Sequence, residues 1–283
     1  MFKIAIDAGH YLYTLGKRVD KSLDPNQTRE WVLNDRVARH LAEAAKQYEN
    51  VETLRVDDPT GKKCVSLAAR CKASNNWGAD VYISCHHDAA GRVFDGGGIT
   101  AFSYKEGTKG AEYRDEIYKF CIINGGLKGD RACPVHAKGY YVLKHTKAPA
   151  VLMEYGFMDS RVDARFITQD AYSKLVGYAT MEGIAKAAGL KKKAVTEDKP
   201  ATTTKTEVCT VEVNVLKKGA KGEQVKALQI LLIGNGCSCG SKGADGDFGS
   251  NTEKALKAYQ KKVGLTQDGS CGPKTWNKIL GVS

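Results

Sequence analysis

Hydrophobic and polar residues alternate at the start of the chain and then give way to small residues. Residues 2–6 read Phe-Lys-Ile-Ala-Ile, and residues 7–10 read Asp-Ala-Gly-His. An alternation of period two predicts a buried β-strand, and the small residues after it predict a turn. In open α/β sheets, ligands bind beyond the carboxyl ends of the strands. The pattern therefore places His10 where chemistry commonly occurs.

A helical pattern follows the first loop. Residues 24–27, Asp-Pro-Asn-Gln, have the form of a helix start, with a capping Asp, Pro at the first helical position and Gln three residues after the cap. We expect a helix from there to about residue 48, with an apolar stripe of Leu33, Val37, Leu41 and Ala44. Glu30 falls on this stripe, where a carboxylate is costly unless it is paired or bound to a metal. The alternative is that Glu30 lies in a solvated first turn, favoured by the helix dipole.

The rest of the first 190 residues alternates between strand and helix patterns. Strand patterns cover 51–56, 81–85, 96–102, 140–144 and 150–155, and helix patterns cover 65–76, 110–121 and 163–188. This alternation predicts an α/β fold: a mostly parallel twisted sheet flanked by helices. Two of the strands end in polar residues, His86-His87-Asp88 after one and Glu154 near the end of the other.

The apolar pattern stops at residue 190 and returns after residue 208. Residues 191–208 are rich in Lys and Thr and lack apolar periodicity, which predicts a flexible linker. We therefore expect a catalytic domain at 1–190, the linker at 191–208 and a small C-terminal domain of three helices at 209–283.

An internal repeat marks this last domain. The motif D-G-x-x-G-x-x-T occurs at 245–252 and again at 268–275, and each copy leads into a helix pattern. A third helix pattern covers 222–235. Asp245 and Asp247 are spaced as in a calcium loop, but Gly249 occupies the next ligand position, and the glutamate of such loops is missing. We therefore exclude a calcium site.

Three potential metal ligands share one predicted edge of the sheet: His10, Glu30 and His86. Two neutral imidazoles and one carboxylate are a common ligand set of catalytic zinc, which keeps a fourth position for water. Glu154, at the end of an apolar strand, is the candidate general base, because partial burial raises the pKa of a carboxyl toward the working pH.

These residues resemble a known family. Residues 4–10, Glu30 followed by Asn34, residues 84–89 and residues 149–157 together are similar to zinc-dependent N-acetylmuramoyl-L-alanine amidases of the amidase-3 type. The resemblance covers about residues 1–190 and implies a fold like that of amidases and zinc exopeptidases. The repeat-containing tail resembles the small three-helix peptidoglycan-binding domain.

The resemblance also implies functional roles. It implies that His10, Glu30 and His86 bind Zn²⁺ and that Glu154 is catalytic. The implied reaction is hydrolysis of the amide that joins the muramic acid lactyl group to L-alanine of the stem peptide. Bacterial cell-wall peptidoglycan is then the partner.

The sequence departs from the family pattern after both histidines. Tyr11-Leu12 replaces the usual Gly-Gly, and His87-Asp88 replaces the usual Ala-Asn. The second departure leaves a choice between His86 and His87 as ligand. Strand alternation directs the two side chains to opposite faces. We expect His86 to be the ligand and His87 to contact the substrate or a carboxylate.

Charge points to an anionic partner. The net charge is +11, and residues 209–283 carry 11 basic and 6 acidic side chains, against 27 and 23 in residues 1–190. The cations of the tail are dispersed lysines, and Trp276 is its only tryptophan, so no aromatic platform for nucleic acid is evident. We expect anionic wall polymers to be contacted, and no nucleic acid.

The nine cysteines form no disulfide framework, and we interpret most of them as reduced thiols. A disulfide or metal clip among Cys237, Cys239 and Cys271 stays open. No apolar run is long enough for a membrane span, and no signal peptide precedes the first strand, so we expect cytosolic synthesis and release at lysis. This favours a phage or prophage endolysin. The alternatives are a mother-cell autolysin and a zinc peptidase that cuts within the stem peptide.

Overall fold

The computed structural model describes residues 1–125, 127, 135–193 and 215–280. The chain forms two compact units, Met1–Ala194 and Val195–Ser283, and each is described separately. Most of the predicted linker lies outside the described residues. Among the described residues, no helix combines the length and the apolar content that a membrane crossing requires.

The first unit is built on a six-stranded sheet in the order β2-β1-β3-β6-β4-β5. The strands are β1 (Phe2–Ala8), β2 (Val51–Arg55), β3 (Val81–Asp88), β4 (Thr100–Ser103), β5 (Val135–Ala137) and β6 (Ala150–Phe157). Neighbouring strands are parallel except for β4 and β6, which pair antiparallel. The predicted α/β fold with a mostly parallel sheet is confirmed.

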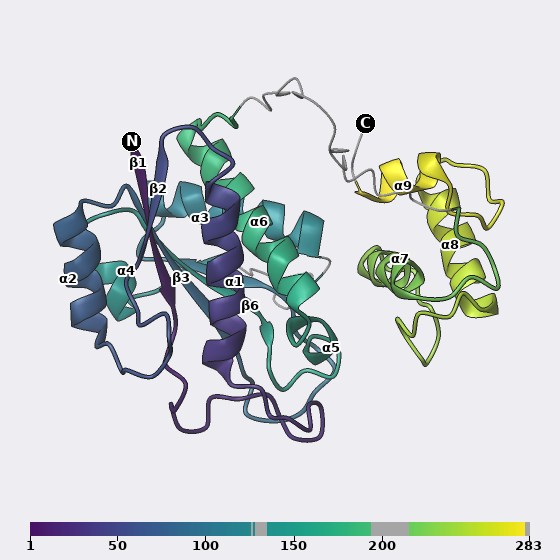
Figure 1. The fold of residues 1–283 in the computed structure, drawn as a ribbon, viewed down its shortest axis with the longest axis horizontal. Coiled ribbons are helices and arrows are strands. Elements are labelled where there is room, and N and C mark those ends of the chain that lie inside the picture. Colours follow the sequence, from purple (N-terminus) through teal and green to yellow (C-terminus); the bar gives the residue numbers. More distant parts are fainter. Residues whose placement is uncertain (126, 128–134, 194–214, 281–283) are drawn as a thin grey trace, which may run out of the picture. The chain divides into compact units, whose positions relative to one another are not determined.

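Helices cover both faces of this sheet (Figure 1). They are α1 (Glu30–Ala45), α2 (Leu67–Trp77), α3 (Lys109–Gly125), α4 (Tyr141–His145), α5 (Ala164–Ile167) and α6 (Asp170–Ala188). Helices α1, α3 and α6 pack together on one face, and α2 and α4 lie on the other. The predicted stripe of α1 is fully buried, which confirms that this helix is held by its apolar side.

The helix α1 begins five residues later than the sequence pattern predicts, at Glu30 instead of Pro25. The carboxylate of Asp24 accepts hydrogen bonds from the backbone N–H groups of Asn26 and Thr28, which closes a turn instead of capping a helix. Gln27 has a φ of 48°, which no helix accommodates. The pattern of Asp, Pro and Gln therefore marks a loop, and the helix begins at Glu30.

Two predicted strands were also wrong, in whole or in part. Residues 141–145 form the short helix α4, because Val142 and Leu143 pack into the core beside β6. The strand predicted at 96–102 begins only at Thr100. Before it, Gly97 has a φ of 140°, and a Cβ there would overlap the carboxylate of Asp163. In both segments a tertiary contact overrides the local pattern.

The second unit contains the helices α7 (Glu223–Gly234), α8 (Ser250–Lys262) and α9 (Pro273–Leu280), which confirms the three predicted helices. The same set of glutamine hydrogen bonds occurs in both copies of the repeated motif. The side-chain amide of Gln229 donates to Asp245, to the Asp247 carbonyl and to Thr252, and Gln260 makes the same three contacts one repeat later. Each motif is thus a loop stapled by a buried glutamine.

The core of the second unit includes three cysteines. Cys237, Cys239 and Cys271 are buried, and all three are free thiols. In this structure no disulfide joins these three residues. Burial raises the pKa of the Cys271 thiol to about 12, which keeps it protonated and apolar in character.

Candidate metal centre

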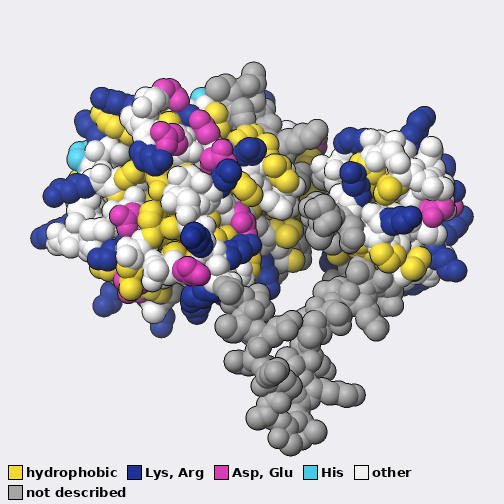
Figure 2. All heavy atoms as spheres, turned by 90° about the horizontal axis from the view of Figure 1, so that it is seen from above, with side chains coloured by type: hydrophobic (Ala, Val, Ile, Leu, Met, Phe, Trp, Pro, Cys, Tyr) yellow, Lys and Arg dark blue, Asp and Glu magenta, His cyan; other side chains and the backbone are white. Residues whose placement is uncertain are grey.

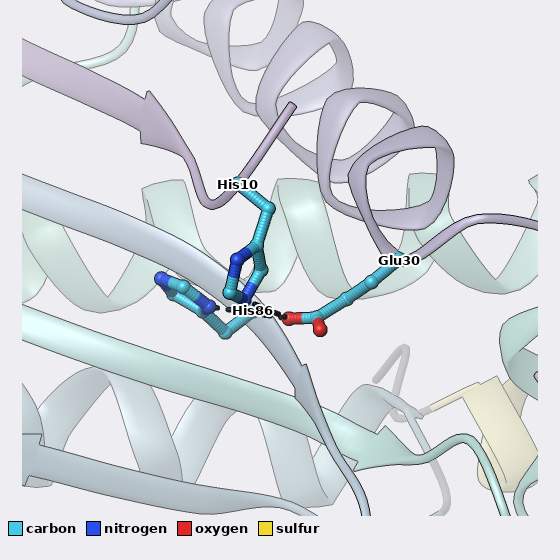
Figure 3. A group of neighbouring side chains, drawn as sticks. All are labelled: His10, Glu30 and His86. Atoms are coloured by element: carbon cyan, nitrogen blue, oxygen red, sulfur yellow. Dashed lines mark hydrogen bonds and ion pairs between the residues drawn. The ribbon is translucent and has the colours of Figure 1, made fainter. Parts of the chain in front are cut away.

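The three predicted ligands converge on one point. Nε2 of His10 and Nδ1 of His86 each lie 3.2 Å from Oε1 of Glu30 (Figure 3). One donor atom from each residue lies within 4.8 Å of the others. His10 follows β1, Glu30 opens α1 and His86 lies in β3, so the fold joins three separate segments. This is a possible metal site.

The donor set fits zinc in type and in size. Zinc bonds of about 2.0–2.1 Å in a tetrahedron separate neighbouring ligand atoms by about 3.3 Å, close to the 3.2 Å observed between Glu30 and each imidazole. Burial raises the pKa of Glu30, but hydrogen bonds from His10 and His86 outweigh it and hold that pKa well below its usual value. The carboxylate is therefore ionised, as a metal ligand must be.

The turn that carries His10 requires a glycine before it. A Cβ on Gly9 would overlap the imidazole ring of His86, so the ring packs directly on the backbone. His10 itself adopts a left-handed φ of 67°, an uncommon conformation for a residue with a side chain. The side-chain amide of Asn34 donates to the Gly9 carbonyl at 3.1 Å and holds the turn against α1.

Arg70, in α2, secures the same turn and was not predicted from the sequence. Its guanidinium donates to the His10 carbonyl at 2.7 Å, to the Ala8 carbonyl at 2.8 Å and to the Asp7 carboxylate. Asp7 also accepts hydrogen bonds from Tyr82 and Ser84. Asp7 is thus a buried structural carboxylate at the end of β1. A buried acid in a strand needs a cation, and this was the one signal that pointed to Arg70.

His87 is not among the residues that line the pocket, and of the two expected contacts, substrate or carboxylate, the structure has the second, through the backbone N–H and not through the ring. Its Nδ1 pairs with the amide oxygen of Asn34 at 2.8 Å, and its Nε2 is buried with no hydrogen-bond partner among the described residues. Burial lowers the pKa of His87 to about 3, so the ring is neutral. Its backbone N–H lies 3.4 Å from Oε1 of Glu30. His87 therefore contacts Asn34 and Glu30 without lining the pocket.

Glu154 lines the same pocket as His10 and His86. It pairs in register with His86 across β3 and β6. Burial, together with the charges of Glu30 and Asp88, raises its pKa to about 8, against the opposing effect of His86. Its Oε2 atom has no hydrogen-bond partner among the described residues. The carboxyl group can therefore exchange a proton near neutral pH.

The pocket has a volume of about 620 Å³. Its lining includes the charged residues Lys17 and Asp88, and also Leu67 of α2, Tyr141 of α4 and Tyr140 just before α4. Charged and apolar side chains in one concave site are typical of a ligand-binding pocket.

Comparison with known proteins adds the identity of both units. Residues 4–186 match the family model described as N-acetylmuramoyl-L-alanine amidase. The chain belongs to this amidase family. Residues 221–279 match the model described as a putative peptidoglycan binding domain. The first match includes all four candidate site residues, and the second includes both copies of the repeat.

Individual proteins agree with this assignment. The amidase CwlM of Bacillus licheniformis is 32% identical over 192 residues, which cover 65% of this chain and 68% of that protein. The sporulation-specific amidase of Bacillus subtilis (strain 168) is 29% identical over 188 residues, 65% of this chain and 67% of that protein. The crystal structure of an amidase from Clostridium difficile 630 matches with a TM-score of 0.59 and 21% identity, covering 66% of this chain and 97% of that one. This likeness shows the fold.

Proposed function

We propose that this amidase hydrolyses the bond between N-acetylmuramic acid and L-alanine of the stem peptide, with zinc as its metal. The observation that carries the proposal is the convergence of His10, Glu30 and His86 beside a pocket that His10, His86 and Glu154 line together. Membership of the amidase family indicates which bond is hydrolysed. The two imidazoles and one carboxylate indicate zinc as the metal.

The residues then have separate tasks. Nε2 of His10, Oε1 of Glu30 and Nδ1 of His86 would hold the ion, which when bound lowers the pKa of water and polarises a carbonyl. Glu154 takes a proton from the attacking water. The same carboxyl group returns the proton to the nitrogen of the leaving amine, since its pKa near 8 suits both steps.

Zinc content combined with mass spectrometry of digested walls tests this proposal. We expect one zinc ion per chain in the purified protein and peptides with a free N-terminal L-alanine in the digest. Products cut within the stem peptide would instead show a zinc peptidase. A metal-free protein with full activity would remove zinc from the proposal.

We further propose that the second unit holds the enzyme on the wall. Its match to peptidoglycan-binding domains supports a wall ligand, and its excess of lysine supports contact with anionic wall polymers. Lys and Arg side chains are scattered over the visible faces of both units without one dense patch (Figure 2). Tethering a weak binding unit to the catalytic unit raises the effective concentration of enzyme at an insoluble substrate.

For the biological role we propose a phage or prophage endolysin. The seven described cysteines are all free, which suits a protein that accumulates in a reducing compartment before release. A mother-cell autolysin has the same features, and the sporulation-specific relative favours it. Deletion of the gene separates the two roles. Loss of lysis after prophage induction supports the endolysin, whereas loss of spore release from the mother cell supports the autolysin.

A further inference from the structure

The two oxygens of the Glu30 carboxylate face different partners. Oε1 faces both imidazoles, each at 3.2 Å. Oε2 lies 3.4 Å from the ammonium group of Lys17. Among the described residues, Oε2 accepts no hydrogen bond, so this ion pair is its polar contact. Only Oε1 is therefore on the side where a metal ion would lie.

The position of Lys17 is set by the backbone. The N–H of Glu30 donates to the Lys17 carbonyl at 3.1 Å, and the N–H of Val19 donates to the Thr28 carbonyl at 2.9 Å. Arg18 and Arg29 form the antiparallel bridge between these two bonds. The segment with Lys17 is thus paired to the residues that open α1, and the lysine is held beside Glu30.

The exposure of the two side chains fits a supporting role. The side chain of Glu30 is 1% exposed, whereas that of Lys17 is 42% exposed. A buried carboxylate needs compensation for both oxygens, and a lysine can reach it from the solvent edge along its flexible stem. Without such a partner, only the long contacts of Oε1 with the Asn34 amide at 3.5 Å and the His87 N–H at 3.4 Å, among the described residues, keep the carboxylate from turning and presenting both oxygens to a metal.

We propose that Lys17 is a positioning residue that holds Oε2 of Glu30 and presents Oε1 alone to the metal. This inference rests on the proposed function, because it requires a metal at the site. It assigns to Lys17 a role that acts through Glu30 and not on the metal itself. Partners of this kind orient metal ligands, and their loss commonly costs 10- to 100-fold in metal affinity or activity.

Removal of Lys17 could also tighten zinc binding, and this opposite result makes the inference testable. Lys17 carries a positive charge near the site of a cation, so repulsion alone predicts that its removal tightens zinc binding. Orientation of Glu30 predicts that its removal weakens zinc binding. The sign of the change in zinc affinity therefore separates the two effects.

The experiment compares full-length wild type with the variants Lys17→Met, Lys17→Arg and Lys21→Met. Lys21 is the matched control, since it is exposed in the same loop and no ion pair of it is found among the described residues. Zinc affinity is measured by competition with a chromophoric chelator, and zinc coordination by X-ray absorption. Thermal unfolding of each apo-protein checks the fold.

We expect Lys17→Met to bind zinc about 10- to 100-fold more weakly and to gain one zinc–oxygen contact as Glu30 becomes bidentate. Lys17→Arg should restore affinity to within a few-fold, and Lys21→Met should match wild type. Unchanged or tighter zinc binding by Lys17→Met would overturn the inference. If Lys17→Met does not fold, Lys17→Gln takes its place under the same criteria. A wild type that binds no zinc would instead overturn the proposed metal, before any variant is compared.

Discussion

At the scale of single residues, the site depends on positions where other residue types would not fit. Gly9 leaves room for the His86 ring, and His10 accepts a left-handed backbone to reach the same point. Glu154 stands in register with His86 and has a raised pKa. The residues with chemical roles are thus supported by residues whose role is only to leave space or to hold a direction.

Replacing Glu154 with Gln separates binding from catalysis. The amide keeps the size of the side chain but cannot take a proton. We expect Glu154→Gln to retain one zinc ion per chain and to lose about 10²- to 10⁴-fold in the rate of wall lysis. Zinc content and turbidity loss of purified walls measure both quantities. Wall lysis at more than a tenth of the wild-type rate would refute the role of Glu154.

Adding a single methyl group at Gly9 should damage the candidate metal site although no ligand is replaced. The new Cβ would overlap the His86 ring and force it away from Glu30. We expect Gly9→Ala to bind zinc at least about tenfold more weakly. Gly139→Ala is the control, because a Cβ there meets no atom within 4 Å. Equal zinc affinities in the two variants would show that the ring tolerates displacement.

At the scale of elements, the candidate metal site lies where β1, β3 and α1 meet, and α2 contacts the turn after β1 from the other face of the sheet (Figure 1). Arg70 reaches from α2 to the carbonyl of His10 and to the buried Asp7. The pair of Arg70 and Asp7 is almost fully enclosed, with exposures of 3% and 1%. Removing one member of such a pair leaves a buried charge without compensation.

Replacing Arg70 with Met should therefore destabilise the first unit. We expect Arg70→Met to lower the free energy of unfolding by about 3–5 kcal/mol. Arg39→Met removes a pair whose arginine is 57% exposed and whose partner Asp35 keeps Arg55, and it should cost no more than about 1 kcal/mol. Urea denaturation of both variants measures the difference. A cost for Arg70→Met as small as that of Arg39→Met would show that the buried pair does not hold the turn.

At the scale of the whole molecule, the chain consists of two units with separate hydrophobic cores. The second unit packs around Leu228, Leu256 and Trp276. The first unit contains the pocket and all the candidate site residues. This separation indicates that binding to the wall and cleavage of the amide can be removed independently.

A chain that ends at residue 193 tests this separation. We expect it to hydrolyse soluble muropeptides at a rate within about twofold of wild type, because the pocket is intact. Its affinity for insoluble walls should fall about 10²-fold or more, since the second attachment is lost. Sedimentation with purified walls and a soluble-fragment assay measure the two effects. Full wall affinity in the truncated chain would remove the proposed role of the second unit.

Local patterns of the sequence determined the elements and the kinds of ligand. The alternation in residues 2–6 was sufficient to predict β1, and the stripe of Leu33, Val37 and Leu41 was sufficient to predict that α1 is buried along one side. Histidine and glutamate side chains at the ends of these elements were sufficient to predict that three potential ligands meet at this edge, as His10, Glu30 and His86 do. Such patterns depend on residues only a few positions apart, so they can be read from the sequence without the tertiary structure.

Only the tertiary structure decided where α1 begins, which ring nitrogens face Glu30, and which residues hold the ligands in place. Arg70 lies 60 residues from the His10 carbonyl that it binds. Lys17 reaches Glu30 through a backbone pairing that the predicted helix start at Asp24 would not have allowed. The physical reason is that these contacts join segments distant in sequence, and their energy depends on burial and direction. Neither quantity exists until the sheet and its helices have packed.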